Sequence, residues 1–314
     1  MKNLTIKRFI IGGLLGALLA GGISVGAVDA LADEVPVVVE QPAVPQPAVE
    51  QPVAPQADVA QPVVEQPVAP QADVAQPVVA PLVVDGVVVT DPQVIMAYNE
   101  QAAYAAMLQQ NTLNFFNNSV FVGDSIMVGF NNYMKNHPES LMGATKFLTV
   151  TSYSAWHAIR GIGKDSLQPV YNGSKGNVWD QVAAMGAERV FMMFGTNDLV
   201  MCSVDKTEEN ILSVAKKIAA AKPGVKIYII SMVPVYANVN KGGLSNENIK
   251  LLNSKLQADA ALYGYHFVDL NSYLKGTNGA ILPAYSSDKY VHQNNKAYKV
   301  WEGVFCDYAG KHFD

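Results

Sequence analysis

From residue 119 onward, short runs of β-forming residues alternate with helical patterns, and this alternation limits the possible folds of the chain. The apolar runs predict strands at 119–123, 145–151, 189–194, 225–231 and 265–270. Helical patterns lie between and after these runs, at 126–137, 177–186, 205–221, 246–263 and 294–309. Near-continuous apolar strands that alternate with helices are typical of a parallel sheet covered on both faces. We therefore expect one doubly wound α/β domain.

The N-terminus has the features of an export signal. Lys2, Lys7 and Arg8 precede an uncharged run over 9–28, and Ala30-Leu-Ala32 provides a small-x-small cleavage site. Cleavage is expected after Ala32, so that 1–32 is a signal peptide. The run is long for a signal core, and an uncleaved membrane anchor is the alternative. Both interpretations predict a secreted or cell-surface protein.

Residues 33–90 consist almost only of Val, Pro, Gln, Ala and acidic residues. A 15-residue unit begins at Gln51 and again at Gln66. Prolines at this density block helices and sheet ladders, so the segment is expected to be disordered or extended. We interpret it as a semi-rigid spacer, and a contact with a cell-wall polymer is the alternative. A lead-in helix is predicted at 91–110, followed by the α/β domain at 111–314.

Composition excludes several classes of function. The formal net charge is −5 and no Lys/Arg cluster follows the N-terminus, so nucleic acid is not an expected partner. Two cysteines, Cys202 and Cys306, are too few for a disulfide-dense scaffold or a Cys-based zinc site. A disulfide between them and two free thiols are both open. No His, Asp or Glu grouping has the local spacing of a metal site, and no metal or cofactor is predicted.

Residues with reactive side chains follow two of the predicted strands and also lie in the loop before the last helix. Gly123-Asp-Ser125 follows the first strand, Gly195-Thr-Asn-Asp198 follows the third, and Asp288 and His292 lie in the loop before the last helix. Each has a structural alternative, as a helix cap or a turn residue. The carboxyl ends of parallel strands meet at one edge, however. Ser, His and Asp form a nucleophile, base and orienter set, and Asn suits an oxyanion hole.

These motifs, in this order and context, resemble the SGNH (GDSL-type) hydrolase superfamily over about residues 119–310. The resemblance implies a three-layer α/β/α sandwich with a five-stranded parallel sheet in the flavodoxin-like order 2-1-3-4-5. It also implies esterase or acylhydrolase chemistry. By this likeness Ser125 is the nucleophile and its N–H an oxyanion donor, Asn197 supplies a second donor from its side chain, and His292 is the general base and acid.

Two positions depart from the superfamily pattern. The loop after the second strand carries Ser152-Tyr-Ser-Ala155 where the superfamily supplies a glycine N–H to the oxyanion hole. We expect a main-chain N–H of this loop, that of Ser154, to replace it. Asp288 stands four residues before His292 rather than three. Either the loop absorbs the extra residue and Asp288 orients the imidazole, or a backbone carbonyl does so and a Ser–His dyad remains.

The function that we expect from these features is that of a secreted serine esterase. It would remove short acyl groups, acetyl above all, from a cell-wall or extracellular glycan. Tyr153, Trp156 and His157, in the loop after the second strand, are expected to bind the substrate. An O-acyltransferase acting on the same substrates is one alternative. A non-catalytic cell-wall binding or adhesion protein with an SGNH-like domain is another.

Overall fold

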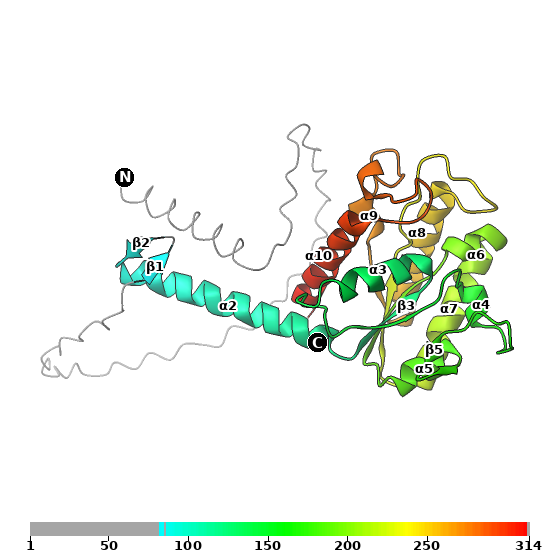
Figure 1. Cartoon of the computed structure of the whole chain (residues 1–314), viewed down its shortest axis with the longest axis horizontal. Helices are drawn as coiled ribbons and strands as arrows, with labels where there is room; N and C mark the ends of the chain where they lie inside the picture. Colours follow the sequence, from blue (N-terminus) through cyan, green and yellow to red (C-terminus); the bar gives the residue numbers. More distant parts are fainter. Residues whose placement is uncertain (1–81, 85, 313–314) are drawn as a thin grey trace, which may run out of the picture. The chain divides into compact units, whose positions relative to one another are not determined.

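The structure is a computed structural model that describes residues 82–84 and 86–312 (Figure 1). The predicted signal peptide and nearly all of the predicted spacer lie outside these residues. The chain divides into two compact units, of which the described parts are 82–96 and 97–312. Within the described residues, no helix combines the length and apolar character that crossing a membrane requires.

The first unit contains a small antiparallel hairpin. Strands β1 (Leu82–Val84) and β2 (Val87–Val89) pair across a turn at Gly86, which has a φ of 78°. Helix α2 (Pro92–Phe116) begins with a proline, whose fixed φ suits the first helical position. It begins one residue later than the predicted helix at 91–110 and ends six residues later. From Ala97 onward α2 belongs to the second unit, and Phe115 and Phe116 at its end lie in the core of that unit.

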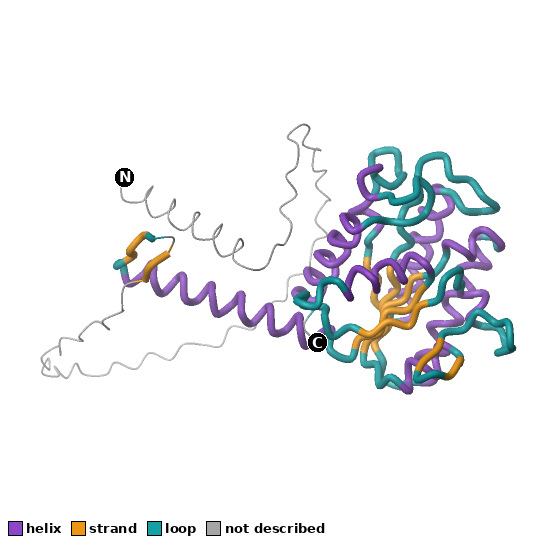
Figure 2. The backbone as a smooth tube through the Cα atoms, in the orientation of Figure 1, coloured by secondary structure: helices purple, strands orange, loops and turns teal. Residues whose placement is uncertain are grey.

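A five-stranded parallel sheet forms the centre of the second unit (Figure 2). Its strands lie in the order β4-β3-β7-β8-β9. Their bounds are β3 (Ser119–Gly123), β4 (Lys146–Thr149), β7 (Arg189–Met193), β8 (Lys226–Ile230) and β9 (His266–Val268). All four pairings are parallel. Counted along the chain, this is the predicted order 2-1-3-4-5, so the expected fold class is confirmed.

Helices cover both faces of the sheet, which gives the three layers (Figure 1). One face packs against α3 (Ser125–Lys135) and α10 (Asn295–Lys311). The other packs against α5 (Val178–Ala184), α7 (Val204–Ala221) and α8 (Asn246–Tyr263). On the α3/α10 face Phe191 stacks between Phe121 and Tyr228, at ring separations of 4.5 Å and 4.3 Å. Such buried aromatic stacks hold the central strands in register beneath the site.

Several short elements connect the main layers. They are α4 (Ala155–Ala158), the hairpin of β5 (Val170–Tyr171) and β6 (Ser174–Lys175), α6 (Thr196–Met201), α9 (Asn271–Leu274) and the 3₁₀ helix η1 (Pro283–Tyr285). None was predicted, because elements this short show too little hydrophobic periodicity. The cysteines, left open by the sequence, are both free thiols.

Candidate active site

Ser125 lies at the tight turn between β3 and α3. Every residue of β3 is buried, and the strand ends at Gly123. A Cβ at Gly123 would lie 2.9 Å from both the Cβ of Met127 and the carbonyl oxygen of Met193, so only glycine fits there. Asp124 then caps α3 by accepting a hydrogen bond of 2.9 Å from the N–H of Ile126. This geometry makes Ser125 the first residue of the helix, where its own N–H has no partner inside the helix.

A chain of two hydrogen bonds joins Ser125 to a carboxylate. The Nε2 atom of His292 lies 3.0 Å from the Oγ atom of Ser125. On the other side of the ring, Nδ1 lies 2.6 Å from the Oδ2 atom of Asp288. With the proton on Nδ1 donated to Asp288, Nε2 is left to accept the hydroxyl proton of Ser125. The structure thus brings together the three residues predicted to form the catalytic set.

The loop of Asp288 and His292 accommodates the extra residue between them. Asp288 Oδ1 accepts hydrogen bonds from the N–H groups of Tyr290 (2.8 Å) and His292 (3.1 Å). Lys289 has a left-handed backbone conformation, with a φ of 54°, which accommodates the extra residue. Its N–H donates a hydrogen bond to the Oγ atom of Ser286. The carboxylate therefore reaches the imidazole directly. Burial by itself would raise the pKa of Asp288, but the hydrogen bonds from His292 and the backbone outweigh it and hold this pKa below its usual value.

Asn197 lies in the first turn of α6. Its Nδ2 atom donates to Asp124 Oδ2 at 3.1 Å and to the carbonyl oxygen of Tyr153 at 3.0 Å. The two hydrogens of this amide are therefore both engaged. An oxyanion beside Ser125 would share or replace one of these acceptors. The amide nevertheless borders the same pocket as Ser125 and His292.

Two buried carboxylates hold this side of the site. Asp198 has no exposed surface and accepts hydrogen bonds from the N–H groups of Ala155 (3.1 Å) and Trp156 (2.9 Å), the first residues of α4. Asp124 is 1% exposed. Burial raises the pKa of each carboxyl to about 6, against the opposing effect of their backbone hydrogen bonds. The ends of β3, β4 and β7 are thereby tied together through polar contacts.

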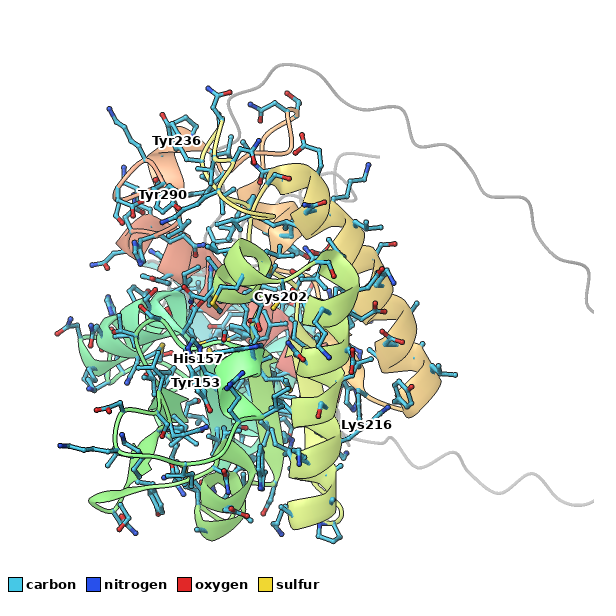
Figure 3. All side chains as sticks on the ribbon, turned by 90° about the vertical axis from the view of Figure 1, so that its right-hand side faces the viewer. Tyr153, His157, Cys202, Lys216, Tyr236 and Tyr290 are labelled. Carbon is cyan, nitrogen blue, oxygen red and sulfur yellow. The ribbon has the colours of Figure 1, made fainter. Side chains whose placement is uncertain are left out.

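The pocket at Ser125 encloses about 350 Å³. Ser125, His292, Asn197 and His157 line it, as predicted for a shared site. Further lining residues carried no signal in the sequence, because they come from separate loops and short helices: Thr151, Ser152, Leu167, Thr196, Val200, Met201, Lys241, Leu244, Tyr290 and Val291. His157 and Tyr290 are labelled in Figure 3, on α4 and on the loop before α10. The lining combines apolar surface with several hydroxyl groups and the amide of Asn197.

Three predictions for the loop after β4 are wrong. The side chain of Tyr153 is completely buried and donates to Gln168 Oε1 at 2.9 Å, so its ring cannot face a substrate. Trp156 does not line the pocket, and the guanidinium of Arg160 covers its ring at 4.0 Å. Ser154 has no exposed surface, so its N–H does not reach the pocket. Its hydroxyl instead caps α4.

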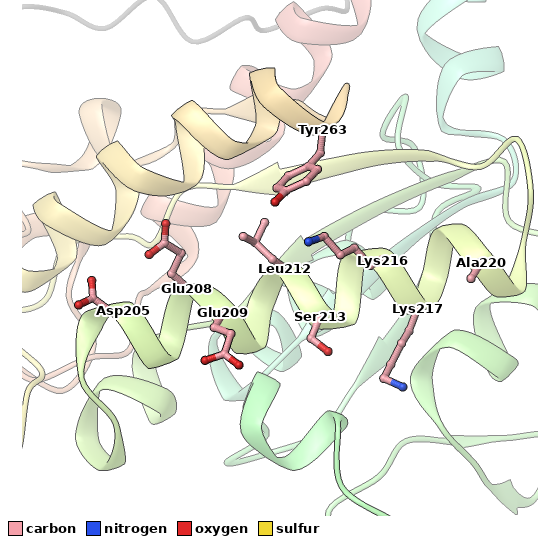
Figure 4. A pocket seen from close by; sticks show the side chains of 9 residues that line it. All are labelled: Asp205, Glu208, Glu209, Leu212, Ser213, Lys216, Lys217, Ala220 and Tyr263. Atoms are coloured by element: carbon pink, nitrogen blue, oxygen red, sulfur yellow. The ribbon is translucent and has the colours of Figure 1, made fainter.

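A larger hollow of about 580 Å³ lies on the outer side of α7 (Figure 4). Acidic residues line one end of it, and Lys216 lies over the ring of Tyr263 at 4.2 Å. It contains no histidine and none of the residues of the Ser125 site. Throughout 82–84 and 86–312, no group of three His, Cys, Asp or Glu residues is arranged to hold a metal ion.

The chain is similar to several proteins of known structure. A Bacteroides fragilis protein proposed to be an acylhydrolase has 21% identity and a TM-score of 0.50, over 62% of this chain and 88% of that protein. A GDSL-like lipase of Bacteroides thetaiotaomicron has 20% identity and a TM-score of 0.49, over 62% of this chain and 87% of the lipase. At these identities the likeness concerns the fold alone. No curated protein matches the chain. The sequence model of the GDSL-like lipase/acylhydrolase family matches residues 121–300, which is more than half of the chain, and the protein therefore belongs to that family.

Proposed function

We propose that the protein is a serine ester hydrolase that acts through Ser125, His292 and Asp288. The observation that carries the proposal is the continuous chain of hydrogen bonds, 3.0 Å from Ser125 Oγ to His292 Nε2 and 2.6 Å from His292 Nδ1 to Asp288. A hydroxyl with a base at this distance is an activated nucleophile. Membership of an acylhydrolase family supports the same reaction class.

The reaction follows from the positions of these groups. Ser125 Oγ attacks the ester carbonyl while His292 Nε2 accepts its proton, and Asp288 stabilises the resulting imidazolium. His292 then returns the proton to the departing alcohol, which leaves an acyl group on Ser125. A water molecule then attacks the acyl-enzyme while His292 takes its proton. His292 returns this proton to Ser125 Oγ as the bond to the acyl group breaks and the carboxylic acid leaves. His292 is 44% exposed, which gives water direct access to the base.

Two donors are proposed for the oxyanion of the tetrahedral intermediate. The N–H of Ser125 stands at the N-terminus of α3, where the helix dipole also favours negative charge. Asn197 Nδ2 is the second donor, and it would exchange its bond to the carbonyl of Tyr153 for one to the oxyanion. Such an exchange leaves the bond to Asp124 in place to orient the amide.

The proposed substrate is a short acyl ester of an extracellular glycan, acetyl above all. The pocket of about 350 Å³ is at the small end of ligand sites, which favours a short acyl group. Its hydroxyl and amide groups suit a polar alcohol portion. The export signal and the proline-rich spacer predicted from the sequence support an extracellular, surface-held location, and a contact between the spacer and a wall polymer belongs to the same proposal.

Labelling and hydrolysis together test the reaction class. The wild-type protein should react with a fluorophosphonate probe and hydrolyse 4-nitrophenyl acetate, and Ser125→Ala should do neither. Ser213→Ala is the matched control, because this serine lies on α7 in the separate hollow. If Ser125→Ala keeps wild-type hydrolysis, the proposed nucleophile is wrong. A folded wild-type protein that neither reacts nor hydrolyses would favour the binding-protein alternative.

A further inference from the structure

A second histidine, His157, borders the pocket but belongs to none of the catalytic contacts. It lies on α4 and is one of the residues that line the pocket of Ser125 and His292. Its Nδ1 atom lies 2.6 Å from the hydroxyl of Ser154, on the buried side of the ring. Among the described residues its Nε2 atom has no hydrogen-bond partner. This nitrogen is therefore available to a substrate.

The contacts of Ser154 determine which nitrogen of His157 carries the proton. The Ser154 hydroxyl accepts a hydrogen bond of 3.1 Å from the backbone N–H of His157. Within the described structure, the remaining contact of this hydroxyl is with His157 Nδ1. Ser154 is completely buried, so its hydroxyl hydrogen needs that acceptor. Nδ1 consequently holds the lone pair, and the proton of the neutral ring is on Nε2, as a donor.

The surroundings of His157 favour this neutral form. Burial lowers the pKa of the ring below its usual value, and the charge of Arg160 lowers it further. Arg160 itself is held over the ring of Trp156. No carboxylate hydrogen-bonds to His157 in the described residues, in contrast to His292 with Asp288. The two histidines of the pocket thus differ in role. Nε2 of His292 accepts a hydrogen bond, whereas Nε2 of His157 donates one.

The helix that carries His157 is fixed in place before any substrate binds. Asp198 accepts hydrogen bonds from the first two N–H groups of α4. Gln168 Nε2 donates to the carbonyl oxygen of His157 at 2.8 Å, and Ser154 caps the helix. A donor held by several buried contacts loses little conformational freedom when it binds, which is the condition for strong discrimination.

We propose that His157 is a specificity-determining residue whose Nε2–H donates a hydrogen bond to an acceptor oxygen in the alcohol portion of the ester. The inference rests on the proposed ester hydrolysis and names its substrate class more closely. A short acyl group offers only its carbonyl oxygen, and that oxygen is directed to the oxyanion donors. The acceptor must then lie on the alcohol, which selects esters of ether- or hydroxyl-bearing alcohols, such as sugars, over esters of alkyl alcohols.

A matched pair of acetates tests this selection. Tetrahydropyran-2-ylmethyl acetate and cyclohexylmethyl acetate differ only in a ring oxygen that replaces a CH₂ group. Wild-type kcat/KM should favour the ether by roughly 10-fold, because a buried donor left without an acceptor disfavours the carbocycle. In His157→Phe, which keeps a ring but removes the donor, the ratio should fall to about one. Ser213→Ala is the control, because this serine lies on α7 in the separate hollow, and it should keep the wild-type ratio.

The outcomes separate this inference from the proposed reaction. A ratio of about one in the wild type, or a wild-type ratio kept in His157→Phe, overturns the role of His157 and leaves ester hydrolysis standing. Fluorophosphonate labelling of each variant shows that its site is folded. If His157→Phe is not labelled, His157→Ala, which adds no bulk, gives the same comparison of ratios. The tautomer is tested by long-range ¹H–¹⁵N correlation in the full chain, where a proton on Nδ1 of His157 would also overturn the proposal.

Discussion

The two sides of the site differ in burial and in the origin of their contacts. On one side His292 and Asp288 are 44% and 35% exposed and are four residues apart in the sequence. On the other side Asp198 is fully buried, and its partner Ala155 is 43 residues away, while Asn197 and Asp124 are 73 residues apart. The exposed side supplies proton transfer. The buried side fixes the geometry of the site, because its hydrogen bonds connect three strand ends and α4.

Exposure decides what a substitution on each side will change. Water replaces a hydrogen bond that is lost at an exposed position, so the folded state loses little free energy. At a buried position the former partner remains without a hydrogen bond and away from water, which costs about 1–3 kcal/mol per group. Activity and stability are therefore separable on the His292 side and coupled on the Asn197 side. The following predictions test this difference.

His292→Ala should have the largest effect on activity and almost none on stability. Loss of the base in a serine hydrolase lowers kcat by roughly 10⁵-fold or more. The free energy of unfolding should change by less than about 0.5 kcal/mol, since the side chain is 44% exposed and water can replace its hydrogen bonds. Hydrolysis of 4-nitrophenyl acetate and urea unfolding measure the two quantities. His312→Ala, at an exposed histidine remote in the sequence, is the control. A loss of 2 kcal/mol or so in His292→Ala would contradict the separation.

Asn197→Ala should reduce activity and stability together. Removing one oxyanion donor lowers kcat by roughly 10²–10³-fold with little change in KM. The same substitution leaves Asp124 Oδ2 and the carbonyl of Tyr153 without their donor, at a cost of about 1–3 kcal/mol in unfolding free energy. Asn240→Ala, at an exposed asparagine, should change neither. Wild-type kcat with a reduced unfolding free energy would show that Asn197 only supports the fold.

The sequence could predict the exposed side of the site and, on the buried side, Asn197 at the end of a strand. Ser125 and Asn197 follow apolar strands, and Asp288 and His292 share one short loop, so strand ends and local spacing were enough to group them. The order of the five strands followed from the family resemblance and is the one observed. Local spacing did not show whether the Asp288 carboxylate contacts the imidazole of His292. This contact depends on the left-handed backbone conformation of Lys289.

The loop after β4 could not be predicted, because its side chains are placed by distant partners. Tyr153 is turned into the core by Gln168, and Asp198 draws the N–H groups of Ala155 and Trp156 into a single helical turn. That turn buries Ser154 and leaves His157 at the pocket. An aromatic residue in a loop looks the same in the sequence whether it faces solvent or the core. Hydrogen bonds between residues that are 15 or 43 positions apart in the sequence leave no periodic pattern in it.

The two sides should respond to pH in opposite directions. The pKa of Asp124 is raised from 3.8 to about 6 by burial, so between these values the unfolded chain is ionised while the folded protein keeps its proton. Stability should therefore fall as the pH rises from about 4 to 6, by roughly 3 kcal/mol for this group. Asp198 acts in the same direction. The lowered pKa of Asp288 adds stability that is lost only as the pH falls below 3.8.

Urea unfolding at a series of pH values measures these slopes. Asp124→Asn should remove the contribution of one carboxyl between pH 4 and 6, and Asp288→Asn should leave that part of the curve unchanged. A wild-type stability that rises over this interval would show that the buried carboxylates are stabilised as anions. The buried side would then resemble the exposed one in its electrostatics.

Among the substitutions at His292, Asn197 and Asp288, Asp288→Asn should have the smallest effect on kcat. In a triad with a buried aspartate the same change lowers kcat by about 10⁴-fold. Here the carboxylate is 35% exposed, and water screens its charge, so the loss should be roughly 10–100-fold. The kcat of this variant for a short aryl acetate measures it, with Asp307→Asn on the exposed end of α10 as the control. A loss near 10⁴-fold would mean that the loop of Asp288 and His292 excludes water once substrate is bound. The contrast between an exposed and a buried side would then belong to the free enzyme alone.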